Sequence, residues 1–283
     1  MAQFRKDTQQ FLADSKTIFE VNMIGTADGS VASNSNALGV MTNNQNSLAA
    51  PWEVQVARGK VPGVSLVNLY GYQASVDGAF IPIWEANTAY TYPSSAGETM
   101  TLYSSSASDT NVSILINGLD SNFNIQTETL VLTNGTTGVN TTKSYRRING
   151  ISVVGAVNPV GTLYLSNTGK TTNYAIIAIG TGRSQMSIYT VPNGYIFYLN
   201  RVTVAGEGST NGKALNYRSY TINGNGIIGT VLTSPFATNY ETNRVVPNPY
   251  PGNTSIQWQC QSPSQISAMG LRVEGVLIAA NAA

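Results

Sequence analysis

The side chains that most enzymes use for proton transfer are almost absent from this sequence. Its 283 residues include no histidine and a single cysteine, Cys260. The lack of histidine excludes Ser-His-Asp and Cys-His catalysis, and it excludes zinc sites that need a histidine ligand. A lone cysteine forms no intrachain disulfide and no thiolate cluster, so we interpret Cys260 as a packing residue. We therefore expect no enzymatic activity, no cofactor and no bound metal.

Paired carboxylates are the catalytic chemistry that the sequence still offers, because two acids are enough for glycoside hydrolysis. Only 14 acidic residues occur in the chain, and no pair of them is distinguished by its spacing. Asp120 follows Gly118-Leu119 in a turn-like site, where it is expected to cap the turn. Glu128 alternates with Gln126 and is expected on the solvated face of a strand. The candidate acids are Glu85, Glu98, Asp109, Asp120 and Glu128.

Aromatic and basic residues are the side chains that would bind sugars and nucleic acids. Tryptophan and tyrosine can stack on sugars, but in β domains of this size they more often pack in cores or interfaces. We interpret Trp52 and Trp84 as structural, and Trp258 fits a half-buried strand. Arg146-Arg147 is the sole pair of adjacent basic residues in the second half of the chain, whereas nucleic-acid binders cluster such residues on one face. Nucleic acid is therefore not the favoured partner.

The turn residues predict an all-β protein. Asn-Gly occurs seven times, and this dipeptide supplies the positive φ angles of tight turns. The segments between these turns alternate or run apolar over strand length. The clearest hairpin is expected at Ser187–Val204, around Pro192-Asn193-Gly194. Other strands are expected at Asn111–Ile116, Ile125–Leu132, Thr162–Leu165 and Tyr174–Ile179.

We predict three parts in the chain. Residues 1–50 form an extended N-terminal arm, whose second half is polar and of low complexity. Residues 51–153 form a first antiparallel β-sandwich or jelly roll, and residues 154–283 form a second one of the same class. The start of the chain lacks the unbroken hydrophobic core of an export signal, and no apolar run is long enough to span a membrane. We expect the chain to be made in a cytoplasm and to have no membrane partner.

Charged residues are few, 10% of the chain, and they are segregated along it. Between Val61 and Thr142 there are six acidic residues and no lysine or arginine. From Lys143 to Ala283 there are ten basic residues and three acidic ones. One interpretation is chance clustering in a charge-poor chain. The other is that an acidic first sandwich meets the basic second sandwich of a neighbouring copy.

Several stretches resemble structural proteins of marine tailed bacteriophages, especially those that infect cyanobacteria. Asp14–Gly29 is similar to the opening of one such group of virion proteins. Further stretches resemble a second group of such proteins: Trp52–Tyr72, Ile83–Pro93, Gly118–Gly135 and Val191–Leu199. Together the resemblances extend over most of residues 14–200. The resemblance implies location in a virion and β architecture, and it carries over no functional residues.

The sequence therefore predicts a virion structural protein that forms homo-oligomers and contacts other virion proteins, such as a capsid decoration, knob or fibre-base protein. The alternative is a tail or receptor-binding module that recognises a host surface glycan or protein. An arm packed into neighbouring subunits would favour the first, and an exposed aromatic cluster would favour the second. The candidate inter-subunit contacts are Arg146, Arg147, Asp77, Glu85 and Trp258.

Overall fold

A computed structural model describes residues 51–206, 215–262 and 267–281. The chain divides into two units, Met1–Lys60 and Val61–Ala283. The described part of the first unit holds one short helix, α4 (Trp52–Ala57), which begins directly after Pro51. The predicted arm, residues 1–50, lies outside the described residues. No helix in the described ranges combines the length and hydropathy that a membrane crossing requires.

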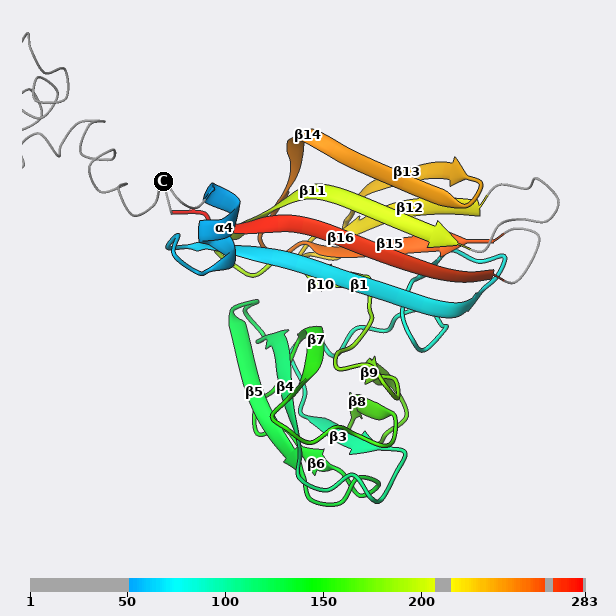
Figure 1. The fold of residues 1–283 in the computed structure, drawn as a ribbon. Helices are drawn as coiled ribbons and strands as arrows, with labels where there is room; N and C mark the ends of the chain where they lie inside the picture. The colour runs from blue at the N-terminus through cyan, green and yellow to red at the C-terminus, as the bar shows by residue number, and fades with distance from the viewer. Residues whose placement is uncertain (1–50, 207–214, 263–266, 282–283) are drawn as a thin grey trace, which may run out of the picture. The chain divides into compact units, whose positions relative to one another are not determined.

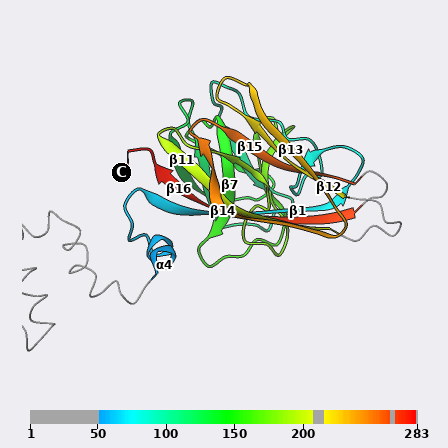
Figure 2. The same ribbon diagram turned by 90° about the horizontal axis from the view of Figure 1, so that it is seen from above.

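The second unit is built from antiparallel strands, which confirms the predicted all-β class. Two of its sheets face each other as layers (Figures 1 and 2). Sheet A contains, in spatial order, β1 (Val64–Val76), β16 (Ser267–Ala279), β11 (Tyr195–Gly206) and β14 (Asn239–Pro251). Sheet B contains β10 (Ile188–Thr190), β15 (Ser255–Gln261), β12 (Leu215–Ile222) and β13 (Ile228–Phe236), and β2 (Ile81–Pro82) pairs with β15.

Two smaller sheets are formed by the middle of the chain. Sheet C contains, in spatial order, β6 (Val139–Asn140), β3 (Met100–Ser104), β8 (Leu163–Asn167) and β9 (Asn173–Ile177). Sheet D contains β5 (Ile125–Leu132), β4 (Val112–Leu119) and β7 (Arg147–Val154). Four of these strands match the strands expected from the sequence, and the bounds of β5 coincide with the prediction, with side-chain exposure alternating along it.

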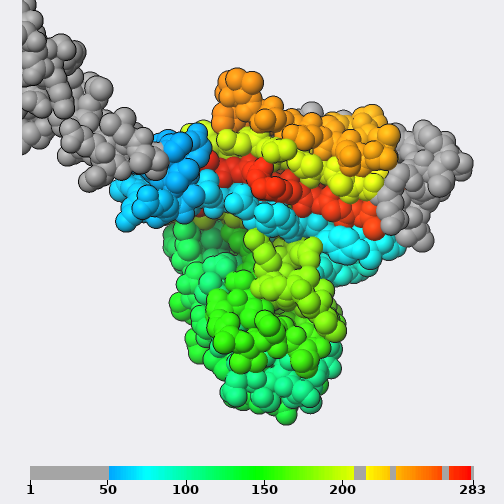
Figure 3. All heavy atoms as spheres, viewed as in Figure 1, coloured from blue at the N-terminus to red at the C-terminus, as the bar shows by residue number. Residues whose placement is uncertain are grey.

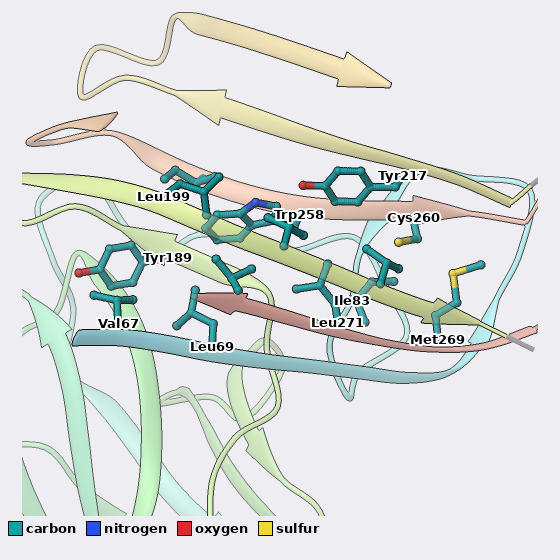
Figure 4. Packing of buried hydrophobic residues seen from close by; sticks show 14 of the residues in the cluster. Val67, Leu69, Ile83, Tyr189, Leu199, Tyr217, Trp258, Cys260, Met269 and Leu271 are labelled. Carbon is teal, nitrogen blue, oxygen red and sulfur yellow. The ribbon is translucent and has the colours of Figure 1, made fainter. Parts of the chain in front are cut away.

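Each pair of sheets encloses its own hydrophobic core. The core of sheets A and B contains Trp258 and Phe197, both fully buried, and Figure 4 shows Trp258 among the aliphatic side chains of several strands. The core of sheets C and D contains Ile114 and Leu165. Each large apolar side chain that is fully buried contributes roughly 1.5–3 kcal/mol of transfer free energy, so each sandwich has an independent source of stability.

The strand pairing corrects the predicted boundary at residues 153 and 154. The first strand, β1, pairs along its length with the last strand, β16, although about 200 residues separate them. Core membership changes between Ile83 and Trp84, and again between Ile188 and Tyr189. Residues 84–188 therefore form a sandwich inserted into the other one. We call residues 84–188 the inserted lobe, and the described residues of 61–83 and 189–281 the enclosing lobe.

The insertion also removes the predicted acidic and basic bodies. The inserted lobe contains five acidic and five basic residues. The remainder, residues 61–83 and 189–283, contains four acidic and five basic residues. The predicted opposition of an acidic and a basic sandwich is therefore wrong for the folded protein, because each lobe takes strands from both halves of the sequence.

The predicted hairpin at Ser187–Val204 is also wrong. β10 pairs with β15 in sheet B, whereas β11 pairs with β14 and β16 in sheet A. The turn at Pro192-Asn193-Gly194 thus carries the chain from one layer to the other. A hairpin with Asn-Gly turn chemistry does join β12 and β13, where the Asn223 side-chain oxygen accepts hydrogen bonds from the backbone N–H groups of Asn225 and Ile227.

Candidate functional site

The candidate catalytic acids are engaged in structural hydrogen bonds of their own chain. Asp120 accepts hydrogen bonds from the backbone N–H groups of Asn122 and Asn124, at 2.8 and 2.9 Å, which confirms its predicted turn-capping role. Burial by itself would raise the pKa of Asp120, but the hydrogen bonds from Asn124 and Asn122 together outweigh it and lower the pKa. Asp120 is therefore a turn residue of the inserted lobe.

Glu128, Glu98 and Asp109 hold loops to the sheets of the inserted lobe. Glu128 accepts hydrogen bonds from the Thr142 hydroxyl and from the backbone N–H groups of Thr142 and Lys143, so it is more than a solvated strand residue. Glu98 accepts from the backbone of Ser94 and from the hydroxyl of Tyr174, and Asp109 accepts from the backbone N–H groups of Val160 and Gly161. Each carboxylate thus has a structural function.

Glu85 differs from the other acids because its protonation is displaced. Burial raises its pKa to about 7, and the backbone N–H groups of Ala178 and Gln185 act in the opposite direction. One of its oxygens, Oε2, is buried and has no hydrogen-bond partner. The described residues contain no group of three or more potential metal ligands, so Glu85 belongs to no such group there. The burial of Glu85 therefore favours its protonated form.

The arginine doublet joins the two lobes. The Arg147 guanidinium donates from Nε to the Ser255 hydroxyl at 3.1 Å and lies 4.4 Å from the centre of the Tyr92 ring. The Arg146 guanidinium lies 4.1 Å from the centre of the Phe123 ring and donates to the Ser121 carbonyl. Burial lowers the pKa of Arg147. These groups are used within the chain, which the sequence alone did not indicate.

The other candidate contact residues lie in different environments. Trp258 is fully buried in the enclosing lobe, so the predicted half-buried strand position and its predicted role as an inter-subunit contact are wrong. Asp77 is exposed and accepts a hydrogen bond from the backbone of Ala79. Trp84 is a core residue as predicted, whereas Trp52 is exposed on α4. Cys260 is buried and burial raises the pKa of its thiol, which confirms the packing interpretation.

A groove runs between β1 of the enclosing lobe and sheet D of the inserted lobe. It consists of two adjoining hollows of about 240 and 280 Å³. Four residues line both hollows, so the two are continuous: Leu69, Asn117, Asn149 and Arg183. We call this feature the β1 groove. Pockets between domains are common binding sites, because two surfaces supply their walls.

The β1 groove has a single charged side chain. Of the residues that line it, Arg183 is basic and none is acidic. The Arg183 guanidinium donates from Nη2 to the Asn68 carbonyl at 2.9 Å and lies 4.8 Å from the centre of the Tyr70 ring. None of the ion pairs formed by the described residues includes Arg183. The groove therefore favours a ligand with one negative charge.

Two Asn-Gly dipeptides form the side of this groove, where the sequence predicted turns. Asn117-Gly118 and Asn149-Gly150 lie inside β4 and β7, and Asn117 pairs with Gly150 at a register shift. The Cβ atom of a larger residue at position 118 would lie 2.4 Å from the Arg147 carbonyl oxygen, so the strands require glycine there. No local signal separates these two dipeptides from turns, because a bulge differs from a turn in having paired strands on both sides.

The outermost strands expose apolar residues. Val245 and Val246 are 100% and 80% exposed, and they lie on β14 where its pairing with β11 is interrupted. Ile227 and Ile228, at the start of β13, are also exposed. In Figure 3 the orange atoms of β14 stand out from the surface. Exposed apolar residues on sheet edges indicate a contact surface.

A pair of tyrosines is stacked on sheet C of the inserted lobe. The rings of Tyr103 on β3 and Tyr164 on β8 have centres 5.0 Å apart and are inclined by 21°. Both side chains are partly exposed, and the Lys170 ammonium lies 4.8 Å from the centre of the Tyr103 ring. An exposed aromatic pair of this kind offers a flat surface for stacking.

No protein-family model and no curated protein sequence matches the chain. Among solved structures, it is similar to the VP2 subviral particle of infectious bursal disease virus, at 13% identity and a TM-score of 0.24, over 78% of this chain and 73% of that chain. The Gt strain structure of the same virus matches at 12% identity and a TM-score of 0.23, over 82% and 77% of the two chains. These scores are too low to assign a shared function.

Proposed function

We propose that this chain is a non-enzymatic structural protein of a virion, which assembles with copies of itself and with other virion proteins. A capsid decoration, knob or fibre-base protein is the proposed type, and assembly would take place in the host cytoplasm. The resemblance of Asp14–Gly29 to proteins of marine tailed bacteriophages supports the location. The use of the candidate acids in structural hydrogen bonds supports a role without catalysis.

The observation that carries self-assembly is the exposed valine pair on β14. Val245 and Val246 interrupt a strand at the edge of sheet A, and their side chains have almost no contact with their own chain. Full burial of a valine contributes roughly 1.5 kcal/mol or more, so covering both residues would favour association by a few kcal/mol. Asp77, which is exposed, remains a proposed contact between copies.

The test compares the native chain with a double variant, Val245→Ser with Val246→Ser. Light scattering coupled to size-exclusion chromatography measures the mass of each as a function of concentration. We expect the native chain to associate and the double variant to shift toward monomer, with an association constant lower by at least about tenfold, equivalent to about 1.4 kcal/mol.

The matched control is Val157→Ser with Val160→Ser, because these two valines are also exposed but belong to the inserted lobe. This variant should associate as the native chain does. A native chain that stays monomeric at all concentrations, or its absence from purified particles by mass spectrometry, would refute the proposed function.

A second candidate function is recognition of a host surface glycan, which the stacked pair Tyr103 and Tyr164 favours. Stacking against sugar rings requires aromatic faces that solvent can reach, and both side chains are partly exposed. Replacing both by alanine should abolish binding to host cells or to their polysaccharide if this function holds. Unchanged binding by that variant would exclude the tyrosine pair as the sugar site.

A further inference from the structure

The strand that borders the β1 groove has an open edge. β1 is 13 residues long and, among the described strands, pairs only with β16. The Asn68 carbonyl accepts a hydrogen bond from Arg183 of the inserted lobe, which places this carbonyl on the groove side of β1. Backbone groups alternate in direction along a strand, so those of Leu66 and Tyr70 point to the same open side. Arg183 already binds the Asn68 carbonyl, so the groups of Leu66 and Tyr70 are the donors and acceptors that the edge offers to an added strand.

The side chains along this edge select the chemistry of the added strand. Leu66 is 43% exposed, and Ile125 across the groove is 54% exposed, so apolar contacts are available on both walls. Arg183 supplies one positive charge with no acidic partner among the described residues. The groove thus fits an extended segment in which apolar residues alternate with polar ones and one residue is acidic.

The chain itself contains a segment of this chemistry, Ile18–Ile24, with the sequence IFEVNMI. Its residues Phe19, Val21 and Met23 alternate with Glu20 and Asn22. This is the period-two pattern of a strand with one apolar face, and Glu20 is its single charge. The 26 residues between this segment and Pro51 can span at most about 90 Å when extended, which is enough to reach a neighbouring molecule.

We propose that Ile18–Ile24 of a second copy adds to β1 as a strand in the β1 groove, with Glu20 paired to Arg183. The inference rests on the proposed self-assembly and names the segment and the acceptor that take part in it. The main-chain hydrogen bonds of the edge supply affinity, and the Glu20–Arg183 pair fixes the register of the added strand.

The test is cross-linking between full-length chains that carry one introduced cysteine each. The native Cys260 is buried and its thiol pKa is raised by burial, so brief treatment with a bismaleimide leaves it unreacted. Chains with Val21→Cys are mixed with chains carrying Leu66→Cys. The control mixture replaces the second variant with Val157→Cys, which has the same exposure as Leu66. We expect at least about tenfold more dimer-sized product from the Leu66 mixture.

A charge exchange tests the register. Arg183→Glu in the acceptor chain, or Glu20→Lys in the donor chain, should each lower the cross-linking yield at least about fivefold, and the two together should restore it. Restoration requires direct pairing, since a loss of folding caused by Arg183→Glu would not be reversed by a change in the other chain.

Equal yields from the Leu66 and Val157 mixtures would overturn the inference. A groove occupied by another ligand, such as an acidic saccharide, would give this result, because the cross-linking yield would stay at the control level. A monomer-sized product from one chain with both cysteines, with no dimer from the mixture, would overturn docking between copies. Light scattering on the same samples separates this failure from that of the proposed function: copies that associate without this cross-link refute only the docking, whereas monomers throughout refute both.

Discussion

Arg147 connects the two lobes through a single side chain. Its guanidinium bonds to Ser255 of the enclosing lobe and packs on Tyr92 of the inserted lobe. A planar cation performs both functions at once, because its edge donates hydrogen bonds while its face lies on an aromatic ring. Arg146 and Arg147 were expected to contact other subunits, and a loss of assembly after changing them would now report the fold of the chain itself.

We predict that Arg147→Ala lowers the free energy of unfolding by about 2–3 kcal/mol, since it removes a charge-assisted hydrogen bond and a cation–π contact. For a unit of this size the melting temperature should fall by roughly 5–10 °C. Arg147→Lys should recover only part of the loss, because a compact ammonium cannot both stack and bond. Arg58→Ala, at an exposed arginine, is the control and should change little. An unchanged melting temperature for Arg147→Ala would contradict this role.

Glu85 should make stability depend on pH. Its folded pKa is about 7 against an ordinary value of 4.5, so the folded chain holds a proton between these values that the unfolded chain has released. The free energy of unfolding should therefore decrease as pH rises from about 4.5 to about 7 and stay lower above it. Glu85→Gln should remove this decrease, leaving stability unchanged near pH 4 and raised above pH 7. Thermal melts across this range, with Glu53→Gln as the exposed control, measure it; parallel curves for Glu85→Gln and the native chain would disprove it.

At the scale of single elements, the sequence predicted strands well and their pairing poorly. Ile125–Leu132 is predictable because a run of strand-forming residues between two turns is a local property of the sequence. The Asn-Gly dipeptide was ambiguous, since its positive φ serves a turn at Asn223-Gly224-Asn225-Gly226 and a bulge at Asn149-Gly150. Only the presence or absence of a paired neighbour on both sides separates these outcomes, and that information is not local.

Gly118 tests the close approach of β4 and β7. A Cβ atom there would lie 2.4 Å from the Arg147 carbonyl oxygen and 2.7 Å from a ring atom of Tyr145. Backbone oxygen cannot move aside cheaply, so Gly118→Ala should destabilise the protein by about 1–3 kcal/mol. Gly78→Ala is the matched control, because its Cβ meets no atom within 4 Å and should be neutral or slightly stabilising. Urea denaturation compares the two, and equal midpoints would show that the strands can separate at no cost.

At the scale of the whole molecule, the lobes could not be derived from the order of the chain. The pairing of Val64–Val76 with Ser267–Ala279 joins two segments that are far apart in the sequence. Neither segment has a sequence feature that identifies the strand it pairs with. The same holds for charge, since the acidic and basic halves of the sequence are mixed in each lobe. The groove between β1 and sheet D is formed by both lobes, so its lining residues could not be predicted without the strand pairing.

The insertion determines which fragments can fold. Residues 84–188 contain both sheets and the whole core of the inserted lobe, so this fragment should fold alone. It would lose only the contacts between the two lobes. Residues 51–153 and 154–283 should each fail, because the cut separates β1 from β16 and β3 from β8. Dispersed amide resonances and a cooperative melt are expected for 84–188, with residues 51–283 as the positive control. A cooperative melt from residues 154–283 alone would mean that sheet A tolerates the loss of β1 and would contradict the assignment of β1 to that lobe. If the 84–188 fragment did not fold, the contacts between the lobes, such as that of Arg147 with Ser255, would be needed to form the inserted sandwich.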